Sequence, residues 1–194
     1  MNKIFFNGLI LFFIIGGLSF TSCKKDSTSP ELIIGQTYQG GVIAYILQPG
    51  DPSYNASVLH GLIAAPGDQS TVTGIQWYNG SSITVGDTAT ALGTGMANTK
   101  AIIAAQGTGN YAASLCRNLT LNGYSDWYLP SKNELNKLYL NHAIIGGFSS
   151  SNYYWSSTES NTDTDNAFAQ FFYGGNQFTP NKWGLYYVRA VRSF

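Results

Sequence analysis

Hydrophobic periodicity changes twice along this chain, and those changes limit the folds that it can adopt. Short apolar or aromatic runs between turn residues predict strands at 40–47, 61–65, 153–158, 167–173 and 185–194. Apolar residues recur at helical spacing over 96–106 and 111–119, between the second and third of these runs. The pattern therefore predicts strands, then helices, then strands again.

Turn residues and low-periodicity segments predict the connections between these elements. Residues 81–94 are rich in Ser, Thr and Gly and lack periodicity, which predicts a long loop. A short additional strand is expected at 75–78, directly before an Asn-Gly turn. Residues 174–176, Gly-Gly-Asn, are expected to turn the runs 167–173 and 185–194 toward each other.

A third helix has the clearest start signal in the sequence. Ser131 follows Pro130 as the expected N-cap, and Glu134 stands at the third helical position, so the two form a capping box. The residues expected on its inward face follow at helical spacing: Leu135, Leu138, Tyr139 and His142. We interpret His142 as a residue of the helix end rather than as a ligand.

The N-terminal region has the pattern of a secretory signal. Asn2 and Lys3 lead into an apolar run over 4–20, and small residues directly precede Cys23. The run is only as long as the shortest bilayer-spanning helices, roughly 17 residues. A permanent anchor helix is the alternative, but the cysteine favours a bacterial lipoprotein signal in which Cys23 becomes the lipid acceptor.

These signals predict three parts of the chain. Residues 1–22 are expected to be the lipoprotein signal peptide, and 23–32 a lipidated flexible tether. Residues 33–194 suffice for a single domain and are too few for two ordinary ones. The protein is then expected in the outer membrane, at the cell surface or on the periplasmic face, with the membrane as a partner through the lipid.

Composition narrows the classes of partner. Only 10% of residues are charged, with 10 basic and 10 acidic residues and no basic cluster, so nucleic acid is not expected as a partner. The chain is 14% aromatic. Aromatic and uncharged polar side chains are typical of surfaces that meet sugars or proteins, although the aromatic residues could equally build the core.

The second cysteine and two late arginines have structural interpretations. Cys116 has no intramolecular partner once Cys23 carries lipid, and its position on an apolar helical face predicts a buried, inert thiol. Arg189 and Arg192 fall on opposite faces of the last strand, so one of them must face a covered surface. The candidate partners for an ion pair are Asp126, Glu134 and Glu159.

Three motifs carry a family resemblance. They are Gly-Tyr-Ser-Asp-Trp-Tyr-Leu-Pro-Ser at 123–131, Tyr-Trp-Ser-Ser-Thr-Glu at 154–159 and Val-Arg-Ala-Val-Arg at 188–192. In this order they resemble the Legionella collagen-like protein C-terminal domain family. The resemblance implies an α+β, C-type-lectin-like fold with mainly antiparallel strands, about three helices and long loops. This fold is similar to that of formylglycine-generating enzymes.

The resemblance also bears on activity. The family's named member is an adhesin module that binds sulfated polysaccharides, which requires clustered Arg or Lys. This chain lacks such clusters, so a neutral glycan or a surface protein is the expected ligand. The enzymatic relatives use paired cysteines, and the single Cys116 does not match them. No catalytic residue, cofactor or enzymatic activity is expected.

Candidate ligand-binding residues lie in two loops. Asn161, Asp163 and Asp165 carry alternating side-chain oxygens of the kind that Ca²⁺ prefers, but too few for a metal site to be predicted. These three, with Tyr173 and Trp183, are the expected ligand contacts. The alternatives are a structural or assembly lipoprotein without a soluble ligand, or an enzyme with an unrecognised site.

Overall fold

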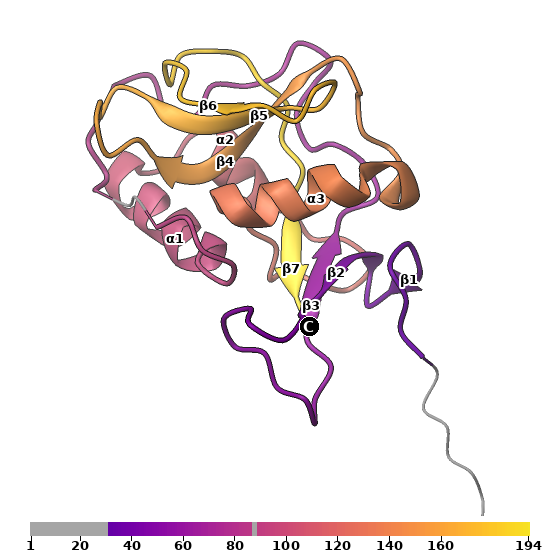
Figure 1. Cartoon of the computed structure of the whole chain (residues 1–194). Coiled ribbons are helices and arrows are strands. Elements are labelled where there is room, and N and C mark those ends of the chain that lie inside the picture. Colours follow the sequence, from indigo (N-terminus) through magenta and orange to yellow (C-terminus); the bar gives the residue numbers. More distant parts are fainter. Residues whose placement is uncertain (1–30, 87–88) are drawn as a thin grey trace, which may run out of the picture. The chain divides into compact units, whose positions relative to one another are not determined.

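The described part of the chain, residues 31–86 and 89–194 of a computed structural model, contains seven strands and three helices (Figure 1). The elements in chain order are β1 (Thr37–Tyr38), β2 (Gly41–Ile46), β3 (Gly61–Ala64), α1 (Gly95–Gln106), α2 (Ala112–Arg117), α3 (Lys132–Ile145), β4 (Tyr153–Glu159), β5 (Ala167–Phe171), β6 (Gln177–Phe178) and β7 (Val191–Ser193). All strand pairs are antiparallel. The predicted α+β fold with three helices and mainly antiparallel strands is confirmed. The predicted signal peptide and Cys23 lie outside the described residues.

The first sheet joins the two ends of the folded unit, Leu32–Phe194. Its strand order is β1-β2-β3-β7, with Ile63 of β3 opposite Arg192 of β7. Gly61 opens β3 because a Cβ there would collide with the backbone oxygen of Tyr45 on the neighbouring strand. Residue 61 must therefore be glycine for β2 and β3 to pair at their ends.

The second sheet has the order β4-β5-β6 and corrects one prediction. The Gly-Gly-Asn turn at 174–176 connects β5 to the short strand β6, not to the last strand of the chain. The predicted strand at 185–194 is also too long, because only Val191–Ser193 is strand, and it pairs with β3. Within 185–190 the backbone forms two isolated β-bridges instead of a strand, one between Tyr186 and Ile75 and one between Tyr187 and Tyr154. The expected strand at 75–78 is likewise reduced to one of these bridges.

Helix α3 packs against both sheets and separates them (Figure 1). Its predicted capping box is confirmed: Ser131 Oγ accepts the N–H of Glu134 at 3.3 Å, and Glu134 Oε2 accepts the N–H of Ser131 at 2.7 Å. Burial raises the pKa of Glu134 above its ordinary value. Leu135 and Leu138 are buried, as predicted. The later residues of that face, Tyr139 and His142, are half-buried and contact Phe172.

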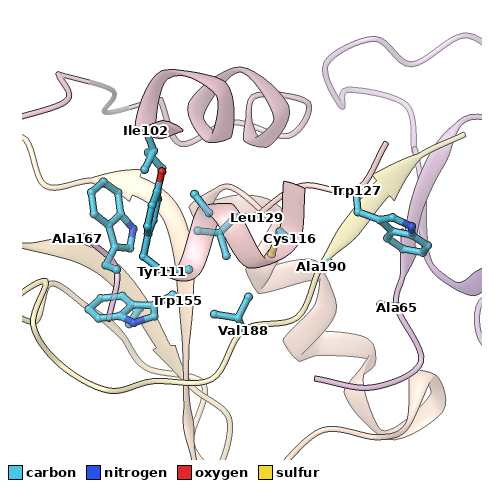
Figure 2. Packing of buried hydrophobic residues seen from close by; sticks show 14 of the residues in the cluster. Ala65, Ile102, Tyr111, Cys116, Trp127, Leu129, Trp155, Ala167, Val188 and Ala190 are labelled. Carbon is cyan, nitrogen blue, oxygen red and sulfur yellow. The ribbon is translucent and has the colours of Figure 1, made fainter. Parts of the chain in front are cut away.

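Three tryptophans belong to the main core, and Figure 2 shows two of them, Trp127 and Trp155, well apart within the cluster. Trp77, Trp127 and Trp155 are fully buried, and Trp155 Nε1 donates to the Ile75 carbonyl at 2.8 Å. Trp127 and Trp155, which belong to two of the three family motifs, are therefore core residues. Cys116 is buried in the same cluster, and burial raises the pKa of its thiol well above the ordinary value, so it stays protonated and unreactive.

Both late arginines are buried and paired, rather than only one. Arg192 Nε donates to Asp126 at 2.7 Å, a partner that the sequence correctly offered. Arg189 pairs with Asp68 at 2.8 Å, which sequence reasoning missed. Its guanidinium also donates to the carbonyls of Ala65 and Gly147, and thereby ties the end of β3 to the turn after α3.

Helix α3 supplies a stability test. Leu138 is fully buried between the sheets, whereas Leu140 is 63% exposed. We expect Leu138→Ala to lower the free energy of unfolding by about 2–5 kcal/mol, because it leaves a cavity. The matched control Leu140→Ala should change it by less than about 0.5 kcal/mol. Urea denaturation measures both, and equal effects would contradict the proposed orientation of the helix.

Candidate ligand-binding surface

Four aromatic side chains form a continuous group at the surface of the second sheet, which we call the aromatic ledge: Tyr153, Phe171, Phe178 and Tyr186. Tyr153 is its centre and is 37% exposed. Its ring centroid lies 4.5 Å from that of Phe171, 5.0 Å from Phe178 and 5.2 Å from Tyr186. These contacts hold the rings in fixed positions, so the ledge is formed before any ligand arrives.

Strand alternation explains why these rings share a face. Tyr153 of β4 stands directly opposite Phe171 of β5, and Phe178 of β6 stands opposite Ala169. Cross-strand partners point to the same side of a sheet. The opposite side is held to α3, where Gln170 donates to Asn136 at 2.8 Å and Gln177 to the Lys132 carbonyl at 2.9 Å. On the ledge side, Trp155 and Ala169 are buried in the main core, so a ligand can meet only the half-buried rings around Tyr153.

Tyr186 reaches the ledge from a different part of the chain. Residues 182–190 return from the second sheet to the first, and Tyr186 packs on Trp155 with 4.6 Å between ring centroids. A Cβ at Gly184 would lie 3.1 Å from the Tyr186 ring, so glycine lets the ring pack there without shifting by a few tenths of an ångström. Burial raises the pKa of Tyr186, so its hydroxyl is neutral at physiological pH.

Two of the predicted ligand contacts, Tyr173 and Trp183, are exposed aromatic residues close in the chain to ledge residues. Tyr173 follows β5, is 79% exposed and lies 6.0 Å from Phe171. Trp183 is 63% exposed and precedes Gly184, against which the Tyr186 ring packs. Both rings are far more exposed than the ledge itself, so their faces are free to stack on a ligand.

The other predicted contacts, Asn161, Asp163 and Asp165, form a loop next to Trp183. The Lys182 N–H donates to the Asp165 carbonyl at 2.9 Å. The Asp163 carboxylate accepts the Asp165 N–H and the Asn166 amide, and Asp165 accepts the Ser82 hydroxyl at 2.6 Å. These carboxylates therefore stabilise the loop itself. In the described residues no three His, Cys, Asp or Glu side chains gather as a metal site would require.

A buried ion pair includes Lys182, the residue before Trp183. Lys182 Nζ is 2.5 Å from Glu159 Oε1, and the two side chains are 0% and 1% exposed. Glu159 also accepts the N–H groups of Val85 and Gly86, and Lys182 donates to the Ile83 carbonyl. The pair thus fastens the 83–86 segment to the end of the second sheet.

Sequence reasoning found the two exposed rings and missed the ledge. Tyr173 and Trp183 stand out in the sequence as aromatic residues in loops. The ledge was hidden because its rings come from β4, β5, β6 and the 182–190 segment, and only the fold brings them together. Alternation of Tyr153 with Trp155 and of Phe171 with Tyr173 was the available signal.

The geometry defines a class of site. Half-buried aromatic rings with the exposed Tyr173 beside them suit a ligand with apolar faces. Among the described residues, no helix is long and apolar enough to cross a membrane. The chain is an α+β module that carries this surface on one sheet.

Comparisons with known proteins identify the family. The Lcl C-terminal domain family matches residues 69–192, and the chain belongs to this family. No curated protein matches the chain. Among solved structures it is similar to a fimbrial protein from Bacteroides ovatus ATCC 8483, with 15% identity and a TM-score of 0.47. That match covers 78% of this chain and 43% of the fimbrial protein, so the chain spans less than half of that protein's length.

The Lys182–Glu159 pair can be tested by substitution. We expect Lys182→Met to lower the free energy of unfolding by about 3–5 kcal/mol, because it leaves a buried carboxylate without its cation. Adding Glu159→Gln should recover part of that loss. Lys100→Met, at an exposed position, is the control and should stay within about 0.5 kcal/mol of the unchanged protein. Urea denaturation of the four proteins measures these differences. A Lys182→Met effect as small as that of the control would contradict a buried Lys182–Glu159 ion pair.

Proposed function

We propose that this chain is a lipid-anchored, extracytoplasmic binding module that recognises a neutral glycan through the aromatic ledge and its two flanking rings. The observation that carries the proposal is the group of contacting aromatic side chains that ends in the exposed ring of Tyr173, with the exposed Trp183 three residues before Tyr186. A soluble domain gains nothing from exposing such rings unless they meet a partner.

Chemistry favours a glycan over the other expected partner, a surface protein. Pyranose rings present apolar C–H faces and hydroxyl groups together, so they can stack on Tyr or Trp and still hydrogen-bond at their rims. Sulfated polysaccharides require clustered Arg or Lys, whereas Lys182, Arg189 and Arg192 of the neighbouring segment are buried in ion pairs, which disfavours such a ligand. An assembly role without a soluble ligand remains the alternative, in which the ledge and Leu185, 56% exposed, cover another protein.

Glycan binding is tested with the fragment 31–194, which contains both core clusters and every strand described. On a neutral glycan array we expect saturable binding. Tyr173→Ala and Trp183→Ala should each weaken it about 5- to 10-fold, because each removes one stacking face worth about 1 kcal/mol. Tyr54→Ala, at a 39% exposed tyrosine outside the ledge, should leave it unchanged.

Two results would count against the glycan. Equal losses in all three variants would show that the ledge is not the site. Absence of binding across the array would favour the assembly alternative, and crosslinking in the native envelope would then identify the protein partner.

Anchoring is tested separately in cells. Cys23→Ala should release the protein from the membrane fraction, because it removes the lipid acceptor. Cys116→Ala, the matched cysteine control, should remain in that fraction. Retention of Cys23→Ala in the membrane would overturn the anchor, and protease treatment of intact cells distinguishes the cell surface from the periplasmic face.

A further inference from the structure

A groove of about 230 Å³ opens beside the segment that carries Trp183 and Tyr186. Three parts of the chain line it: the segment 69–76, Asn110 and Leu115 before and within α2, and Leu185, whose side chain is exposed. Its volume is below the roughly 300–1,000 Å³ of pockets that enclose a whole small ligand. The groove can therefore hold about one ring of a longer molecule.

Hydrogen bonds join the groove to the segment that carries Trp183 and Tyr186. Ile75, which lines the groove, exchanges two backbone hydrogen bonds with Tyr186 of the ledge, at 2.8 and 3.1 Å. Gln76 also lines the groove and donates its side-chain amide to the Trp183 carbonyl at 3.4 Å. Leu185 of the groove directly precedes Tyr186 of the ledge, so the two sites are neighbours along the chain.

The groove has unused polar groups and no charge. Among the described residues, neither the Asn110 side chain nor Gln76 Oε1 has a hydrogen-bond partner. An amide offers two donors and an acceptor, which suits sugar hydroxyls. Ile75, Leu115 and Leu185 supply apolar walls, and none of the lining residues is ionisable. This combination matches a sugar ring better than an ion or a charged peptide.

We propose that the groove binds one sugar unit of the same neutral glycan whose neighbouring units stack on Trp183 and the ledge. The ligand is then an oligosaccharide rather than a single terminal sugar. This inference rests on the proposed glycan-binding function and extends it to the length of the ligand and to Asn110 as a contact.

The test is a chain-length series. An array that displays neutral oligosaccharides of one to six units for each linkage is probed with the fragment 31–194. We expect affinity to rise with chain length. Asn110→Ala deletes a hydrogen-bonding amide, so it should weaken the binding of the longer oligosaccharides about two- to tenfold and reduce their gain over single sugars by that factor. Leu185→Trp should remove that gain by filling the groove, while Asn133→Ala, an exposed asparagine on α3, should keep it.

The outcomes separate the two proposals. Binding of single sugars as tight as binding of oligomers, or an undiminished gain in both groove variants, would overturn the groove and leave the ledge intact. Absence of binding to every glycan would overturn both. Because Asn110 is exposed and makes no side-chain hydrogen bond among the described residues, its variant should keep the thermal stability of the fragment, which circular dichroism checks.

Discussion

The position of the aromatic ledge depends on the return segment 182–190, which is fixed at both ends by buried ion pairs. Lys182 binds Glu159 at its start, and Arg189 binds Asp68 at its end. A buried pair is no more stabilising than well-packed apolar residues, but each partner accepts only one geometry. Between these two points the chain has no freedom to shift by a residue, so Trp183 and Tyr186 are held in their places.

The same constraint explains why the surface can be aromatic without collapsing into the core. Tyr186 packs on buried Trp155 with one face and on Tyr153 at the surface. It therefore connects the tryptophan core to the ledge. Tyr173 and Trp183 lack such support and remain exposed. The rings are thus buried at Trp155, half-buried in the ledge and exposed at Tyr173 and Trp183. This arrangement gives a rigid surface whose outermost rings have free faces.

Local signals predicted the elements well, and long-range pairing explains most of the errors. The capping box at Ser131 and Glu134 depends on residues three positions apart, and the sequence predicted it correctly. Asp68 escaped prediction because it lies more than a hundred positions from Arg189, and no local pattern joins them. Residues 185–190 were expected in a strand because their aromatic pattern resembles one, but two isolated bridges capture their backbone instead. The ledge was missed for the same reason: its rings come from four separate segments.

The arrangement of the two sheets decides which parts of the fold lie near the ledge, where a ligand is proposed to bind. Strand β1 is the first element after the expected tether and sits at the edge of the first sheet, whereas the ledge belongs to the second sheet. Helix α3 lies between the sheets, and β1 is well separated from β4–β6 (Figure 1). The first strand and the ledge therefore belong to different sheets, so β1 does not cover the aromatic surface on which the proposed glycan would stack.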